Sequence, residues 1–142
     1  MTLHQILFAL HILAAALGVG LGFGNAYNAR IAEKQTGDVA RGLAMHRLAM
    51  LPFTDGAIAV LILSGGALLA TGSVPVASLW FNIKMVMVVA LLVLYVTLRL
   101  TVRQLRKGGP TPALAQRLKV ISPLLGLSSV LIVVFAVLAF EV

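Results

Sequence analysis

Four long apolar runs separated by shorter polar stretches set the pattern of the chain. A helix needs about 20 residues to cross a hydrocarbon core of roughly 30 Å, and each run reaches about that length. The pattern therefore predicts an all-α, integral membrane, up-and-down four-helix bundle that forms one domain. The predicted helices cover about residues 3–24, 43–70, 79–102 and 113–140.

The composition agrees with a protein that faces lipid. The 142 residues are 61% hydrophobic and 11% charged, with a mean hydropathy of +1.06, more than a soluble domain of this size needs to fill its core. Cysteine is absent, which excludes disulfides, thiolate metal sites and a cysteine nucleophile.

The positive charge has a clear distribution along the chain. The formal net charge is +7, and ten of the eleven basic residues flank two connecting segments on one side of the predicted bundle: Arg30, Lys34, Arg41, Arg47, Arg99, Arg103, Arg106, Lys107, Arg117 and Lys119. By the positive-inside rule we expect these segments in the cytoplasm and both termini outside a plasma (bacterial inner) membrane. The basic excess favours membrane lipids as partners and argues against nucleic acid.

The polar segments predict loops and one weak point. Residues 25–41 form the first cytoplasmic loop, whose ends can extend the neighbouring helices, and residues 103–111 form a basic turn. Pro52 removes a backbone donor within the second helix, so a kink or loosened turn is expected there. The start of the chain, residues 1–5, lacks the basic segment of a secretory signal, so the first helix is expected to be retained.

His11 shares a stripe of the first helix with Gly18 and Gly22, because seven residues are close to two turns. Small residues at this spacing let membrane helices approach closely, so His11 is expected to point into the bundle. It is either a hydrogen-bonded core histidine or a ligand of a cofactor or metal. The same glycine face also makes a homodimer a possible arrangement.

Lys84 lies about one turn past Trp80, on a stripe that continues through Tyr95 to Arg99. It either snorkels to the interface or holds an anionic ligand. Counted from the start of each apolar run, His11 and Lys84 lie at a similar depth, roughly 6 to 9 Å at 1.5 Å per residue, so they could face each other.

Four further polar residues are candidates for a site. Asn82 belongs to the outer layer with His11, whereas His46, Asp55 and Arg99 belong to the cytoplasmic half. Asp55 is expected either to pair with Arg99 or to be neutral and hydrogen-bonded. His46 and Met50 have a spacing that suits an ion, although chance explains it as well. His11 and His46 come from opposite sides, so they cannot both bind one haem.

Two motifs of the chain resemble those of known membrane protein families. Residues 8–15, Phe-Ala-Leu-His-Ile-Leu-Ala-Ala, resemble the first helix of the CopD-like superfamily of small membrane proteins. Residues 80–84, Trp-Phe-Asn-Ile-Lys, resemble the motif of HemJ-type protoporphyrinogen oxidases that ends in His-Ile-Lys. The resemblance implies a four-helix bundle with haem b and oxidation of protoporphyrinogen, but Asn82 replaces the histidine of that motif. The length and opening are most similar to a branch of the superfamily without an assigned reaction.

Two hypotheses for function follow. The first is a haem-b redox protein, with His11 as ligand and Lys84 holding a propionate or anionic substrate. The second is a non-catalytic accessory subunit or a carrier of a small molecule or copper. The sequence has no recognisable nucleophile, phosphate loop or carboxylate pair, so whether the protein is an enzyme stays open.

Overall fold

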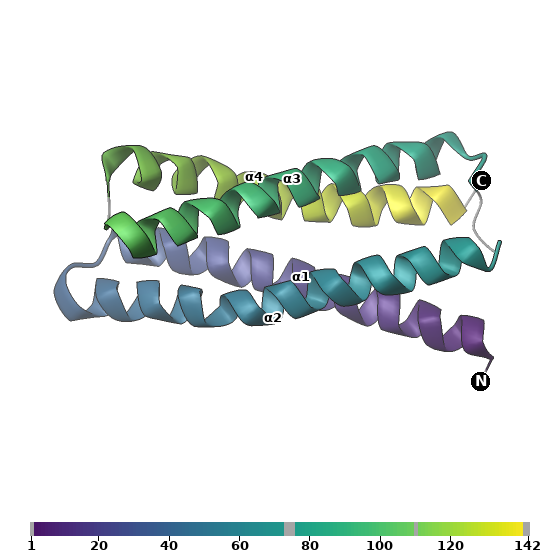
Figure 1. Cartoon of the computed structure of the whole chain (residues 1–142), viewed down its shortest axis with the longest axis horizontal. Coiled ribbons are helices and arrows are strands. Elements are labelled where there is room, and N and C mark those ends of the chain that lie inside the picture. Colours follow the sequence, from purple (N-terminus) through teal and green to yellow (C-terminus); the bar gives the residue numbers. More distant parts are fainter. Residues whose placement is uncertain (1, 73–75, 110, 141–142) are drawn as a thin grey trace. The chain divides into compact units, whose positions relative to one another are not determined.

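A computed structural model describes residues 2–72, 76–109 and 111–140, and these residues form four α-helices and no strand (Figure 1). The helices are α1 (Leu3–Glu33), α2 (Gly37–Ala70), α3 (Leu79–Gly108) and α4 (Pro112–Phe140). The predicted all-α, four-helix class is confirmed. Each helix is long and apolar enough to cross a membrane.

The chain divides into two compact units, and the first, Met1–Val74, is a hairpin of α1 and α2. The two helices run antiparallel, because His11 near the start of α1 contacts Ser64 near the end of α2. Further along α1, a Cβ added to Gly18 would lie 3.9 Å from the side chain of Leu61. Ala14, between these positions, is buried. Ala14 and Gly18 therefore lie on the side of α1 that packs on α2.

The second unit, Pro75–Val142, is a hairpin of α3 and α4. Trp80 at the start of α3 stacks on Phe135 near the end of α4, with ring centroids 6.0 Å apart and planes inclined by 17°. This pair fixes the antiparallel direction of the hairpin. Phe81, Val102 and Ile121 are among the buried apolar side chains of this unit.

The helices extend beyond the predicted ends. Glu33 rather than residue 24 ends α1, and α2 starts at Gly37 rather than residue 43, so the connection between them contains only residues 34–36. A helix of 31 residues rises about 46 Å, well beyond the roughly 30 Å of a hydrocarbon core. The polar residues assigned to the first loop thus continue the helices beyond the apolar region, because their sequence is compatible with a helix.

The basic turn at residues 103–111 is also mostly helical, since α3 continues to Gly108. Gly109 follows with a φ of +78°, and its N–H donates to the carbonyl of Leu105. A positive φ is favourable for glycine, because glycine has no Cβ to clash. Pro52 lies within α2, which continues through it as one helix.

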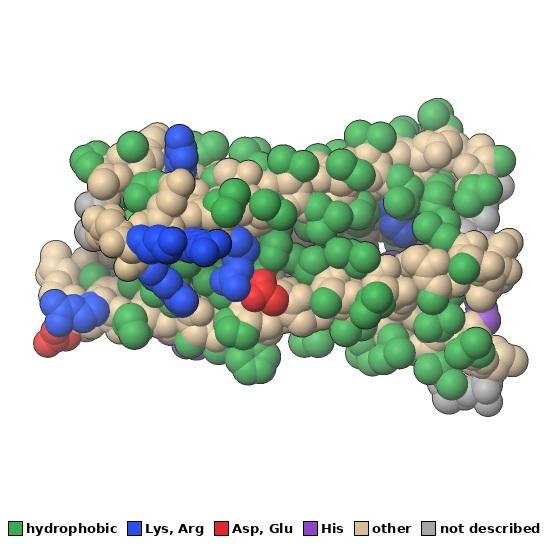
Figure 2. Space-filling model, in the orientation of Figure 1, with side chains coloured by type: hydrophobic (Ala, Val, Ile, Leu, Met, Phe, Trp, Pro, Cys, Tyr) green, Lys and Arg blue, Asp and Glu red, His purple; other side chains and the backbone are tan. Residues whose placement is uncertain are grey.

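Few apolar side chains are buried. At most 17% of the residues in the apolar window of any of the four helices are buried within the structure. Figure 2 shows hydrophobic side chains over much of the visible surface. Such a surface suits lipid, which replaces water as the solvent around these helices.

Candidate functional site

The first candidate site is centred on His11, on the side of α1 that contacts α2. His11 is half-buried, and Ala14 and Gly18 follow it along the same stripe of the helix. The neighbouring residues Ile12 and Leu13 are 51% and 61% exposed, so they point away from this contact. His11 therefore faces α2 within the α1–α2 hairpin.

The His11 ring is hydrogen-bonded to Ser64 of α2. The distance between His11 Nδ1 and Ser64 Oγ is 2.9 Å, and Ser64 is only 4% exposed. Ser64 Oγ also lies 2.6 Å from the carbonyl oxygen of Val60, one turn earlier in α2. A hydroxyl has a single hydrogen, and a carbonyl can only accept, so Ser64 donates to Val60.

Ser64 must then accept the other hydrogen bond, and His11 Nδ1–H is its donor. This arrangement fixes the neutral imidazole as the Nδ1–H tautomer and leaves the ring lone pair on Nε2. A nitrogen with a lone pair can bind a metal ion or accept a proton. The direction of one hydrogen bond, set by the backbone of α2, therefore decides which ring nitrogen of His11 carries the hydrogen.

Gly65 makes room for this ring. A Cβ added to Gly65 would lie 3.1 Å from His11 Cε1 and 3.5 Å from His11 Nδ1. Carbon atoms rarely approach so closely, so a Cβ at residue 65 would require the imidazole to move by a few tenths of an ångström. A Cβ at the next residue, Gly66, would meet no described heavy atom within 4 Å. The close approach at His11 thus depends on one particular glycine of α2.

The glycines of α1 contribute less to the close approach of α1 and α2 than their spacing predicts. Among the described atoms, a Cβ at Gly18 would meet only Leu61, at an ordinary contact distance, and a Cβ at Gly20, Gly22 or Gly24 would meet nothing within 4 Å. Among the glycines, the one whose added Cβ would lie closest to another helix is Gly65 of α2, which faces His11.

Lys84 occupies the predicted stripe of α3 in the second unit. Lys84, Val88, Leu91 and Arg99 are half-buried and Tyr95 is buried, whereas Val86 and Val89 on another face are 69% and 59% exposed. The ammonium nitrogen of Lys84 lies 5.9 Å from the centroid of the Phe81 ring, within range of a cation–π interaction.

Asn82 is exposed, and its side-chain amide donates to the carbonyl oxygen of Ser78, 3.2 Å away. This bond ties the amide to the start of its own helix. The same carbonyl oxygen also accepts from the backbone N–H of Asn82, so the side-chain bond is local to the first turn of α3 and satisfies no unpaired backbone group.

Among the remaining candidates, His46 and Met50 lie in the first half of α2, Asp55 lies close to the middle of α2, and Arg99 lies in the second half of α3. His46 is exposed, whereas Met50 and Asp55 are half-buried in α2 and Arg99 is half-buried in α3. In the described part of the chain, no group of three or more His, Cys, Asp or Glu side chains is arranged to hold a metal ion. His11 is thus a single potential ligand rather than part of such a cluster.

Ser64 and Gly65 are the site residues that sequence reasoning missed. Ser64 is the only hydroxyl residue between Ala57 and Ala70, and it directly precedes the Gly65–Gly66 pair. An isolated hydroxyl beside glycine in an apolar run is a signal for an interhelical hydrogen bond. The depth of Ser64 in its helix also matches that of His11 once α1 and α2 are antiparallel.

Comparison with known proteins places the chain in a family. Searches against curated proteins and against solved structures found no match. A family model described as a predicted integral membrane protein matches residues 5–140, which is nearly the whole chain and includes all four helices. This description agrees with the four apolar helices and with their lipid-compatible surface. The chain belongs to the DUF2269 family of predicted integral membrane proteins.

Proposed function

We propose that this chain is a membrane redox protein that would hold haem b through His11. The observation that carries the proposal is the hydrogen bond from His11 Nδ1 to Ser64. Histidines that bind metals almost always donate their other ring nitrogen to a fixed acceptor, which sets the tautomer and the orientation of the ring. Haem iron, when bound, would supply one-electron chemistry.

The side chains around His11 suit this role. Ser64 holds the ring through Nδ1, so Nε2 is the nitrogen that would bind the iron. Gly65 leaves space for the ring against α2, so the orientation is fixed by packing as well as by the hydrogen bond. One histidine can be enough to hold haem, as in other histidine-ligated haem proteins.

The resemblance to the CopD-like superfamily and HemJ-type oxidases supports haem b, because His11 lies in the matching first-helix motif. The same resemblance gives weaker support to oxidation of protoporphyrinogen. Asn82 replaces a histidine of that motif, and an amide cannot take up and release a proton as imidazole does. We therefore propose redox chemistry at a haem and leave the substrate class at an anionic small molecule.

We propose that Lys84 binds the negatively charged group of such a molecule. It is a half-buried cation in an apolar helix, where a charged side chain is by default a candidate for function. The charge pattern supports the plasma membrane as the location, with the basic helix ends in the cytoplasm and both termini outside.

The test is an absorption spectrum of the full chain purified in detergent after expression with excess 5-aminolevulinate, a haem precursor. We expect a Soret band that shifts on reduction with dithionite, and we expect His11→Ala to abolish or shift it. His46→Ala serves as the matched control, because His46 is exposed and lies in the opposite half of the helices. Colourless wild-type protein, even after titration with haemin, would contradict the proposal.

A second candidate function is a non-catalytic subunit or a carrier. The hydrogen bond from His11 to Ser64 favours it, because this bond stabilises the hairpin without any ligand. Metal analysis of the same sample separates a copper carrier from a haem protein. Protein that contains neither haem nor copper would favour the accessory subunit.

A further inference from the structure

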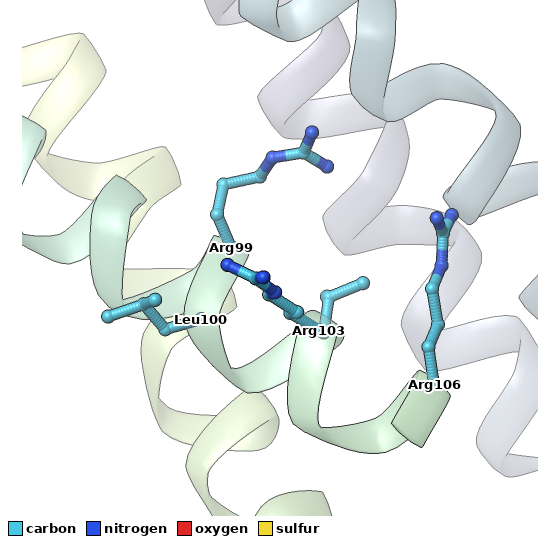
Figure 3. A pocket seen from close by; sticks show the side chains of 5 residues that line it. Arg99, Leu100, Arg103 and Arg106 are labelled. Atoms are coloured by element: carbon cyan, nitrogen blue, oxygen red, sulfur yellow. The ribbon is translucent and has the colours of Figure 1, made fainter.

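Three arginines lie on one face of the C-terminal part of α3. Arg99, Arg103 and Arg106 are spaced four and three residues apart, so they follow one another along a single side of the helix. The first and last are separated by about 10 Å along the axis at 1.5 Å per residue. In Figure 3 the side chains of Arg99 and Arg106 project to the same side of α3, and Arg103 lies between them along the helix.

These arginines line a pocket together with two apolar residues, Leu100 and Val102. Arg103 and Arg106 are exposed and Arg99 is half-buried, so the cationic groups occur at different depths. Val102 is buried, whereas Leu100 is 53% exposed. The pocket therefore combines three guanidinium groups with an accessible aliphatic surface.

The position of the pocket limits the ligand. It lies where the apolar run of α3 ends and the basic segment begins, which the charge pattern assigns to the cytoplasmic interface. A soluble anion needs the cationic groups but has no use for an exposed leucine beside them. A phospholipid uses both, because its phosphate joins a charged headgroup to an acyl chain.

We propose that this pocket binds the phosphate group of an anionic phospholipid of the cytoplasmic leaflet. Guanidinium groups form paired hydrogen bonds with phosphate oxygens, and a cationic lining favours a lipid with net negative charge. A zwitterionic lipid carries a cation next to its phosphate, which the same arginines repel. Leu100 provides the surface for the first part of the acyl chain.

Stabilisation of the helix end does not account for all three arginines. A cation in the last turn offsets the negative end of the helix dipole, and this explains Arg106. The dipole effect falls off within one turn, so it does not reach Arg103. Arg103 is therefore the residue whose substitution tests lipid binding most directly.

The experiment is native mass spectrometry of the intact chain in a non-ionic detergent, titrated with dioleoyl-phosphatidylglycerol or dioleoyl-phosphatidylcholine. We expect a single saturable phosphatidylglycerol adduct that binds at least about fivefold more tightly than phosphatidylcholine. Arg103→Gln should weaken this adduct about fivefold, which corresponds to roughly 1 kcal/mol for one basic residue at an anionic surface. Arg103→Lys keeps the charge, so its affinity for phosphatidylglycerol should fall less than that of Arg103→Gln.

Arg117→Gln is the matched control, because Arg117 is an exposed arginine of α4 in the same basic part of the unit and does not line the pocket. It should leave phosphatidylglycerol binding unchanged. Equal binding of the two lipids, or equal losses in Arg103→Gln and Arg117→Gln, would overturn the proposal. Displacement of phosphatidylglycerol by inorganic phosphate at the same concentration would also overturn it, because the ligand would then be a soluble anion.

Discussion

Ser64 accepts a hydrogen bond from His11 across the α1–α2 interface and donates its own hydroxyl hydrogen to a backbone carbonyl of α2. Its Oγ lies 2.9 Å from His11 Nδ1 and 2.6 Å from the carbonyl oxygen of Val60. The two bonds together select one tautomer of an imidazole inside an apolar helix pair. The first two predictions test whether this selection matters for structure, for ligand binding, or for both.

Removing the Ser64 hydroxyl should allow His11 to adopt both neutral tautomers. In Ser64→Ala, Nδ1 loses its acceptor, so we expect the ¹⁵N resonances of the ring to change from a single Nδ1–H form to a mixture. The loss of stability should be small, about 0.6 kcal/mol for a hydrogen bond between membrane helices. If His11 binds haem, its affinity should fall about 10- to 100-fold, as for other partners of ligating histidines.

Ser129→Ala is the control for this experiment. Ser129 Oγ donates to the carbonyl oxygen of Gly126 within α4, so its removal deletes a hydroxyl but no bond between helices. It should leave the His11 resonances and haem affinity unchanged. If Ser64→Ala also leaves the ¹⁵N spectrum unchanged, Ser64 does not fix the tautomer.

Gly65→Ala should displace the His11 ring. The added Cβ would lie 3.1 Å from His11 Cε1, so either the imidazole or the helix must move. Overpacking of this kind typically costs about 1–3 kcal/mol, which thermal unfolding of the detergent-solubilised protein can measure. The ring resonances of His11 should shift in the same variant.

The adjacent Gly66→Ala gives a closely matched comparison. A Cβ there meets no described atom within 4 Å, and alanine is favoured over glycine within a helix by roughly 1 kcal/mol. We therefore expect unchanged or slightly higher stability and an unchanged His11 spectrum. Equal effects of the two substitutions would mean that helix propensity, rather than contact with His11, controls the result.

The sequence predicted the number, type and approximate position of the helices because an apolar run of about 20 residues has few structural alternatives in lipid. The helix ends were less predictable. Residues 25–33 are polar but compatible with a helix, so hydropathy marks the edge of the membrane there rather than the end of α1 at Glu33. The same reasoning explains why α3 reaches Gly108.

The partner of His11 could not be derived from periodicity. The stripe formed by His11 and Gly18 indicates which side of α1 packs on a neighbour, but it does not indicate which residue of that neighbour it meets. That depends on the rotation of α2 about its own axis, and α2 is apolar on nearly all sides. Ser64 becomes recognisable as a partner only once the antiparallel hairpin fixes the depth of each residue.

The proposed orientation in the membrane predicts opposite labelling of two sites. The chain contains no cysteine, so single-cysteine variants report without background. Ala77 lies between α2 and α3 and Lys107 lies at the end of α3, and both are exposed. In intact cells, a membrane-impermeant maleimide should modify Ala77→Cys and leave Lys107→Cys unmodified until the membrane is opened. The reverse pattern would place the basic segments outside.

The last prediction separates a lysine that binds a ligand from one that only reaches the interface. Lys84 is half-buried, and its ammonium group lies 5.9 Å from the centre of the Phe81 ring. In Lys84→Met the side chain keeps a similar length and loses its charge. Loss of the Phe81 interaction costs about 0.5–1 kcal/mol, whereas removing a charge from the apolar region gains a comparable or larger amount. We therefore expect Lys84→Met to fold at normal yield.

Ligand content then decides the role of Lys84. If Lys84 holds an anionic group, Lys84→Met should lose haem during purification, while Lys84→Arg should keep part of it because the positive charge remains. The measurement is the ratio of haem to protein at equal yield, with Arg117→Gln as a control that removes one positive charge from an exposed position. An unchanged ratio in Lys84→Met would show that the charge is dispensable for binding. Lys84 would then be a snorkelling residue that packs on Phe81, and any site at His11 would have to hold its ligand without Lys84.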